Sequence, residues 1–122
     1  KFLKENILNK VNSKNVFFIG FSQGATVCYD FILQSENTWG GVFPVAGFKR
    51  DQNKIFTVHP NQTQTPIMIG HGISDQIIPI ESSENIYKEL KHNNCNVFFE
   101  KFKGGHKISI NYLKKIKNII DG

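Results

Sequence analysis

Cysteine is scarce in this sequence, and long apolar runs are absent. Cys28 and Cys95 lie far apart and outside any C-x-x-C motif, so we expect neither a zinc site nor a redox-active pair. No apolar run approaches the roughly 20 residues of a membrane helix, and the first residues lack the apolar core of a secretory signal. The sequence therefore predicts a soluble protein without an integral membrane segment. Two buried free thiols point to a reducing compartment, and we expect a cytoplasmic location.

Arginine is also scarce. Arg50 is the only arginine among the fifteen basic residues, and the formal net charge is +5. The lysines do not interleave with aromatic residues, which favours a solvated surface over a nucleic-acid-binding face. Hydrophobic residues make up 39% of the 122 residues, which is enough apolar surface for one packed core. We expect a single domain over residues 1–122 and no nucleic-acid partner.

Short apolar runs alternate with amphipathic stretches, which is typical of parallel strands joined by helices. Apolar runs predict strands at 16–19, 41–47 (which contains Pro44), 66–70 and 96–102. Helical spacing predicts helices at 1–12, at 25–34, from Ser82 or Ser83 to about 93, and from the cap Ser109 to about 120. The polar residues 48–65 predict a surface connection. The expected fold is an α/β parallel sheet of about four strands with helices on both faces.

The most informative motif joins the first predicted strand to the helix after it. Residues 20–24 read G-F-S-Q-G, the spacing of a sharp strand-to-helix turn that exposes a nucleophilic serine. The glycines would let the strand and helix crowd together, and the backbone N–H of Gln23 would point at a developing oxyanion from the helix N-terminus. We predict Ser22 as the nucleophile and Gln23 as an oxyanion donor. The alternative is a glycine-rich turn whose serine only caps the helix.

Two further residues follow later strands. Asp75 lies on the loop after the third predicted strand, and His106 follows the fourth one behind two glycines. Because the carboxyl ends of parallel strands meet at one edge of a sheet, both would emerge beside Ser22. There His106 would take the Ser22 proton while Asp75 orients its ring, and the chain order Ser, Asp, His is that of an α/β-hydrolase. A turn-forming Asp75 and a loop His106 bonded to backbone are the structural alternatives.

The remaining histidines do not predict a metal site. His59 and His71 have no carboxylate or thiolate at ligand spacing. We expect His71 to shape the loop that carries Asp75, and His92 to interact with the dipole at the end of its helix.

These segments resemble the acyl-protein thioesterase and phospholipase/carboxylesterase family of α/β-hydrolases. Three segments match the motifs of that family: G-F-S-Q-G at 20–24, H-G-I-S-D at 71–75 followed by Ile78-Pro79, and Gly105-His106. The resemblance implies a serine hydrolase that cleaves thioesters or carboxylic esters of fatty acyl groups without a metal or organic cofactor. Ala25 is a departure, because the family often has another glycine at that position.

Members of that family are close to twice this length. The chain begins just before the strand that precedes Ser22, so we expect it to correspond to the C-terminal half of the fold, without the early loop that carries the second oxyanion donor. Loss of one such donor typically costs on the order of 100- to 1000-fold in rate. The strand residues Val16, Phe17, Phe18 and Ile19 would then form an exposed apolar edge that favours self-association.

The sequence thus predicts a serine esterase or thioesterase. Its substrate would be an acyl ester or thioester, such as a lipidated protein or a lysophospholipid, with Ile77, Ile78 and Phe48 bordering the acyl pocket. Two alternatives stay open. One is a non-catalytic fragment or binding module that retains the three residues without a complete oxyanion hole. The other is a small-ester or dienelactone-like hydrolase.

Overall fold

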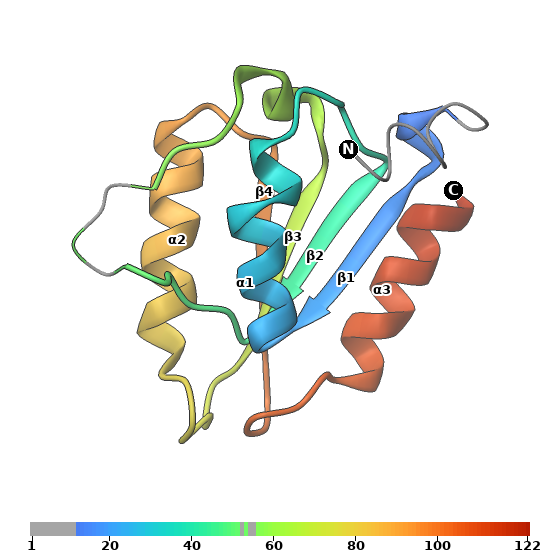
Figure 1. The fold of residues 1–122 in the computed structure, drawn as a ribbon. Coiled ribbons are helices and arrows are strands. Elements are labelled where there is room, and N and C mark those ends of the chain that lie inside the picture. The colour runs from blue at the N-terminus through green and yellow to red at the C-terminus, as the bar shows by residue number, and fades with distance from the viewer. Residues whose placement is uncertain (1–11, 52, 54–55) are drawn as a thin grey trace.

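The computed structural model describes residues 12–51, 53 and 56–122 (Figure 1). Within them the chain forms four strands and three α-helices, in the order β1 (Phe17–Phe21), α1 (Gln23–Asp30), β2 (Gly41–Val45), β3 (Ile67–Gly72), α2 (Ile80–His92), β4 (Val97–Phe102) and α3 (Ile110–Asp121). Short 3-10 helices span Ser13–Asn15, Ile32–Gln34 and Pro60–Gln64. The helix predicted over residues 1–12 lies outside the described residues except for its last position. No described helix has both the length and the apolar character needed to cross a membrane.

All four strands are parallel and lie in the order β1-β2-β3-β4. Figure 1 shows that their carboxyl ends share the lower edge of the sheet. The register pairs Phe21 with Val45 at that edge, and Gly72 with Phe102. The loops that follow β1, β3 and β4 therefore leave the sheet on the same side, as the sequence predicts.

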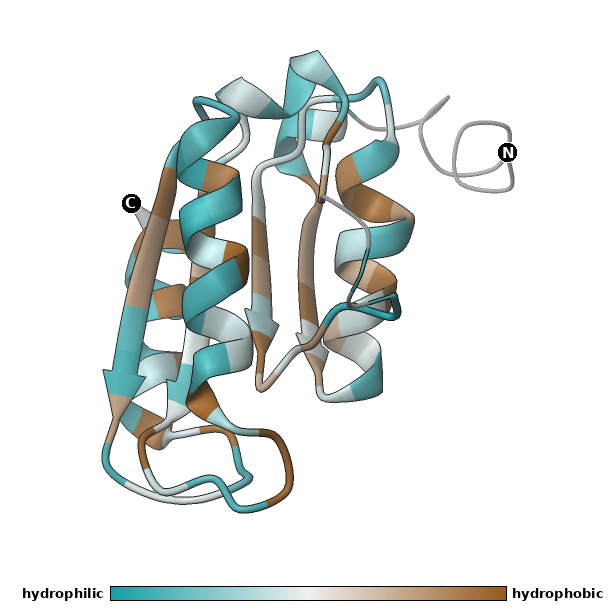
Figure 2. Cartoon of the chain, turned by 90° about the vertical axis from the view of Figure 1, so that its left-hand side faces the viewer, coloured by the Kyte–Doolittle hydropathy of each residue, from teal (hydrophilic) through white to brown (hydrophobic). Residues whose placement is uncertain are grey.

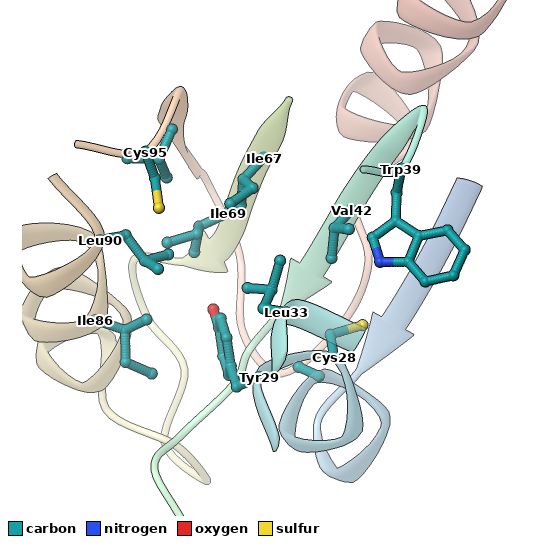
Figure 3. Packing of buried hydrophobic residues seen from close by; sticks show 12 residues of the cluster. Cys28, Tyr29, Leu33, Trp39, Val42, Ile67, Ile69, Ile86, Leu90 and Cys95 are labelled. Atoms are coloured by element: carbon teal, nitrogen blue, oxygen red, sulfur yellow. The ribbon is translucent and has the colours of Figure 1, made fainter. Parts of the chain in front are cut away.

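The two faces of the sheet are covered by different helices. One cluster packs α1 and α2 on the first face, with Tyr29, Leu33, Ile86 and Leu90 against Val42, Ile67 and Ile69 (Figure 3). The other cluster packs α3 on the second face, with Tyr112 and Ile116 against Phe43, Val45, Met68 and Phe102. Figure 2 shows the matching pattern: brown along the central strands, and alternating teal and brown on the helices. This confirms the predicted parallel α/β sheet with helices on both faces.

Pro44 sits inside β2, where it can donate no ladder hydrogen bond. Its backbone pairs in register with Gly20 of β1. Between β2 and β3 the register pairs are Val42 with Ile67 and Val45 with Gly70, so the ladder is interrupted opposite Pro44. The strand is retained because all five of its residues are buried in the core.

Three boundaries of two predicted helices are wrong. The helix predicted over 25–34 begins at Gln23 and ends at Asp30, and the chain continues through Phe31 into a separate 3-10 turn. The second helix begins at Ile80 after Pro79, and neither Ser82 nor Ser83 caps it. Proline is well tolerated at a helix start because its missing N–H would have no partner there. The predicted cap Ser109 is confirmed, since its hydroxyl accepts from the Tyr112 N–H at 3.4 Å.

The connection over 48–65 is not only a surface loop. Gln62 and Thr65 are fully buried. The Gln62 amide donates to the carbonyl oxygens of Ser35 and Asn37, at 2.6 and 2.7 Å. The polar type of Gln62 predicts an exposed side chain, but its amide satisfies buried backbone groups of a distant turn.

Both cysteines are free and buried, as predicted. Burial raises the pKa of the Cys28 thiol to about 12 and also raises the pKa of Cys95. Both side chains therefore stay protonated at neutral pH and behave as small apolar core residues.

The apolar edge predicted at β1 is smaller than the sequence suggests. β1 is the end strand of the described sheet, and Ile19 is 51% exposed. Val16, Phe17 and Phe18 are half-buried because they pack against the two clusters. The Phe18 ring packs edge-on against the Trp39 ring, with 4.8 Å between the ring centres. Self-association through this edge stays a prediction that rests mainly on Ile19.

The glycines at 20 and 24 differ in their surroundings, which gives a matched test. A methyl group at Gly20 would overlap the Gly24 carbonyl oxygen and lie 2.9 Å from the Ala25 nitrogen, whereas one at Gly24 would meet nothing within 4 Å. We expect Gly20→Ala to lower the free energy of unfolding by about 1–3 kcal/mol. Gly24→Ala should leave it unchanged or slightly higher, because alanine favours the helix. Urea denaturation checks both. Equal losses in the two variants would contradict the close contact between β1 and α1.

Candidate active site

Ser22 is the one residue between β1 and α1. Its φ and ψ are 57° and −110°, a conformation that L residues adopt only under strain. The neighbouring segments hold it on both sides: its N–H donates to the Val45 carbonyl oxygen at 2.8 Å, and its own carbonyl oxygen accepts from the Ala25 and Thr26 N–H groups. The Ser22 hydroxyl makes no capping hydrogen bond. The sharp turn is therefore present, and the alternative reading of a serine that caps the helix is wrong.

Asp75 and His106 meet directly. His106 Nδ1 lies 2.8 Å from Asp75 Oδ2. The other carboxylate oxygen of Asp75 accepts from the backbone N–H groups of Ile77 and Ile78, both at 2.8 Å. The turn-forming role and the histidine-binding role of Asp75, which the sequence presents as alternatives, are thus carried by different oxygens of one buried side chain.

These contacts decide the charge of Asp75. Burial raises the pKa of this carboxyl group, but the hydrogen bonds from His106, Ile78 and Ile77 lower it, and the net pKa lies below its ordinary value. Asp75 is therefore ionised at neutral pH. Because a carboxylate only accepts, His106 Nδ1 carries the proton in this contact. In the neutral ring, Nε2 then holds the lone pair that a base needs.

His106 lies beside the turn that carries Ser22. The His106 ring stacks at a tilt on Phe21, the residue before Ser22, with 4.7 Å between the ring centres. Within the described residues no hydrogen bond joins the Ser22 hydroxyl to His106. Catalytic hydrogen bonds are often lengthened when no ligand is bound and shorten in the complex with substrate.

The loops after β3 and β4 are docked on each other through small residues. The Ser74 N–H donates to the Gly104 carbonyl oxygen at 2.9 Å. A side chain at Gly72 would overlap the carbonyl oxygens of Gly104 and Gly105, and Gly104 has a φ of +139°. Glycine is required at Gly72 because the two backbones approach closely there, and at Gly104 because of its positive φ. Together the two glycines let the loops place His106 over Asp75.

The predicted oxyanion and pocket residues divide into two places. Gln23 is the first residue of α1, where the N–H groups lack partners within the helix. Gln23 and Phe48 line one pocket of about 370 Å³, together with Thr26, Val27 and Arg50. Ile77 and Ile78 do not line this pocket. Ile77 is 68% exposed, and the backbones of both residues bind Asp75.

Sequence reasoning missed one side chain beneath this site. His71 holds the Asp75 loop as predicted, with its Nε2 2.7 Å from the Ile78 carbonyl oxygen. Its Nδ1 lies 2.6 Å from the hydroxyl of Ser83, and both side chains are fully buried. The local pattern predicts Ser83 as a helix cap, and nothing in its own segment links it to a histidine twelve residues earlier.

The sequence of the chain is similar to known proteins of one family. The profile of the Phospholipase/Carboxylesterase family matches residues 1–122. Carboxylesterase SOBER1 of Arabidopsis thaliana is 29% identical over 120 residues, which cover 97% of this chain and 53% of SOBER1. Acyl-protein thioesterase 1 of Kluyveromyces lactis is 32% identical over 103 residues, which cover 83% of this chain and 41% of the thioesterase.

Solved structures agree with the predicted fold. A crystal structure of a SOBER1 variant from Arabidopsis thaliana matches with a TM-score of 0.85 and 28% identity, over 98% of this chain and 59% of that one. The Bacillus cereus carboxylesterase matches with a TM-score of 0.81 and 23% identity, over 98% and 56% of the two chains. The α/β-hydrolase fold is thereby confirmed. The chain spans about half the length of the curated relatives it matches.

The lowered pKa of Asp75 predicts a pH-dependent effect on stability. A carboxyl group with a lower pKa in the folded state stabilises the fold above its unfolded pKa, and this stabilisation disappears as pH falls through the folded value. Asp75→Asn should therefore reduce the free energy of unfolding at pH 7. Its deficit against the wild type should shrink below about pH 4, the ordinary range of an aspartate.

Urea denaturation across this pH range measures the deficit. Asp51→Asn is the control, because Asp51 is exposed and, among the described residues, its carboxylate accepts only from the Asn53 N–H. A deficit in Asp75→Asn that stays constant with pH would contradict the ionised, hydrogen-bonded carboxylate.

Proposed function

The chain belongs to the Phospholipase/Carboxylesterase family, and on this premise we propose that Ser22, His106 and Asp75 act together to hydrolyse carboxylic esters or thioesters of acyl groups. The observation that carries the proposal is the 2.8 Å contact between His106 Nδ1 and the buried Asp75 carboxylate, beside a serine held in a strained turn. A serine in a strained turn, a base and an ionised orienting group are the parts that serine-dependent acyl transfer requires.

The first half of the reaction transfers the acyl group to Ser22. His106 Nε2 accepts the proton of the Ser22 hydroxyl while Oγ attacks the acyl carbonyl carbon. The oxygen of the tetrahedral intermediate carries the negative charge, and the backbone N–H of Gln23 donates to it. The intermediate collapses, the C–O or C–S bond breaks, and His106 returns the proton to the departing alcohol or thiol.

The second half restores the serine. A water molecule gives a proton to His106 Nε2 and attacks the acyl-serine carbonyl. The new tetrahedral intermediate then expels Ser22 Oγ, which regains its proton from His106, and the carboxylic acid leaves. Asp75 stays ionised throughout, so it stabilises the imidazolium form of His106 in both halves.

The pocket beside Gln23 favours an acyl substrate with apolar carbon. Phe48 and Val27 contribute apolar surface to it, next to the N–H group proposed for the oxyanion. A chain that enters this pocket would leave its carbonyl group near Ser22. This supports a fatty acyl ester or thioester over a small ester, which would gain little from the Phe48 surface.

A non-catalytic fragment is the second candidate. The chain spans about half the length of the curated relatives it matches, and Gln23 is the one oxyanion donor that we propose among the described residues. With a single donor the rate would fall by roughly 100- to 1000-fold. A slow enzyme of this kind would still contain the activated serine, and a serine-directed probe would label it. A non-catalytic fragment would not be labelled.

A fluorophosphonate probe tests whether Ser22 is activated. We expect labelling of the chain to be lost in Ser22→Ala and to fall at least about 100-fold in His106→Ala, the lower bound for a general base. Ser35→Ala is the control, because Ser35 lies beyond the C-terminal end of α1 whereas Ser22 precedes its start, and among the described residues its hydroxyl accepts only from the Asn37 backbone and side chain. A folded chain that the probe does not label, or labelling that survives in Ser22→Ala, would favour the non-catalytic candidate.

A series of acyl esters of increasing chain length tests the pocket. If the acyl chain lies against Phe48, kcat/KM should rise about fourfold for each buried methylene, since each is worth about 0.8 kcal/mol. Phe48→Ala should flatten this dependence, and Ile77→Ala examines the other predicted border of the pocket. Phe98→Ala, at a 60% exposed phenylalanine of β4, is the control. An unchanged slope in Phe48→Ala would favour a small-ester substrate.

A further inference from the structure

A row of hydrogen bonds connects helix α2 to the Asp75 loop from below. Its two side chains, His71 at the end of β3 and Ser83 in α2, are both 0% exposed. Ser83 Oγ lies 2.6 Å from His71 Nδ1, and His71 Nε2 lies 2.7 Å from the Ile78 carbonyl oxygen. Buried polar groups are costly unless paired, and here both ring nitrogens have a partner.

The hydrogen-bond partners determine which nitrogen of the neutral His71 ring carries the proton. A carbonyl oxygen only accepts, so Nε2 carries the proton that it donates to Ile78. In the neutral ring, Nδ1 then accepts, and the hydroxyl of Ser83 is the donor that faces it. With the proton on Nδ1 instead, the Nε2 lone pair would point at the Ile78 oxygen, which is a repulsive contact. Because a hydroxyl can donate or accept, the Ile78 carbonyl oxygen sets this tautomer, and the hydrogen bond with Ser83 holds the ring that binds the loop.

The row ends on the carboxylate itself. The peptide groups of Ile78 join the two sides, because its N–H donates to Asp75 Oδ1 and its carbonyl oxygen accepts from His71. His71 Nε2 is also 3.4 Å from Asp75 Oδ2, the oxygen that binds His106. The N–H group of His71 thus faces both the loop backbone and the carboxylate oxygen used in the proposed reaction.

We propose that His71 is a positioning residue that aims Asp75 at His106, and that the hydrogen bond with Ser83 holds the His71 ring in the orientation needed for this. The inference rests on the proposed function, because it concerns the residue that orients the base. His71 itself does not reach the substrate, since it is fully buried beneath the loop. Its effect passes through Ile78 and Asp75 to the orientation of the His106 ring.

Nitrogen-15 NMR of the histidine rings in the purified chain tests the positioning directly. In the wild type we expect His71 to carry its proton on Nε2, and the His106 Nδ1 proton to be protected and shifted downfield by Asp75. Ser83→Ala should loosen the His71 ring, because Nδ1 loses its partner, and should weaken the His106 signal. Ser82→Ala is the matched control on the same helical turn, because its hydroxyl donates to the Gly47 oxygen and not to His71.

Kinetics on an acyl ester provide the second measurement. Loss of one hydrogen bond in Ser83→Ala should lower kcat by about 2- to 10-fold with little change in KM. His71→Leu should cost more than about 10-fold, and His71→Gln should recover part of that loss, because its amide N–H still reaches the Ile78 oxygen. A structural role alone would not produce this recovery or the split between kcat and KM.

Two outcomes would overturn the inference. One is a His106 proton signal in Ser83→Ala that matches the wild type, and the other is a His71 ring protonated on Nδ1 in the wild type. Neither reading depends on activity, and Ser83→Ala removes one oxygen atom from a helix without leaving a large cavity. Failure of the proposed function has a different signature, namely activity or probe labelling that survives in Ser22→Ala while the NMR results stand.

Discussion

Parallel pairing of the four strands is the constraint on which the site depends. In each case the first residue beyond a strand is still bonded to the neighbouring strand: Ser22 to Val45, Ala46 to Gly70, and Ile73 to Phe102. The ladder therefore continues into the loops and fixes their first positions. Backbone hydrogen bonds thus bring residues that lie more than thirty positions apart in the chain to one edge of the sheet.

Strain and close packing are concentrated at the same edge. Ser22 and the buried Ala46 both have positive φ, 57° and 54°, and both follow a strand directly. Such conformations cost free energy and persist only where the surroundings leave no alternative. Here the ladder bonds hold the backbone, and the missing side chains of Gly20 and Gly72 leave room for the neighbouring segments. The packed core beneath this edge offsets the free-energy cost of the strained turns.

Local patterns predicted the strands, the helices and the three loops of the site, because apolar periodicity and the glycine spacing around Ser22 are contained in a few consecutive residues. They failed where a distant residue decides the outcome. Ser83 looks like a helix cap in its own segment, but His71 recruits it from β3. Gln62 looks like a surface residue, but the backbone at Ser35 and Asn37 needs its amide. No spacing in the sequence encodes such pairs, since they exist only once the sheet has formed.

The groups that bind the Asp75 carboxylate carry no permanent positive charge, and this suits the role proposed for Asp75 beside His106. Within the described residues its carboxylate is bound by backbone N–H groups and by histidine rings, and no lysine or arginine forms an ion pair with it. A permanent cation would neutralise the carboxylate whether or not His106 is protonated, and would weaken its attraction for the proton that His106 gains. Fixed dipoles hold the carboxylate in place and keep it ionised, but leave its charge largely uncompensated. The electrostatic gain from protonating His106 is therefore available in the proton-transfer step of the proposed reaction.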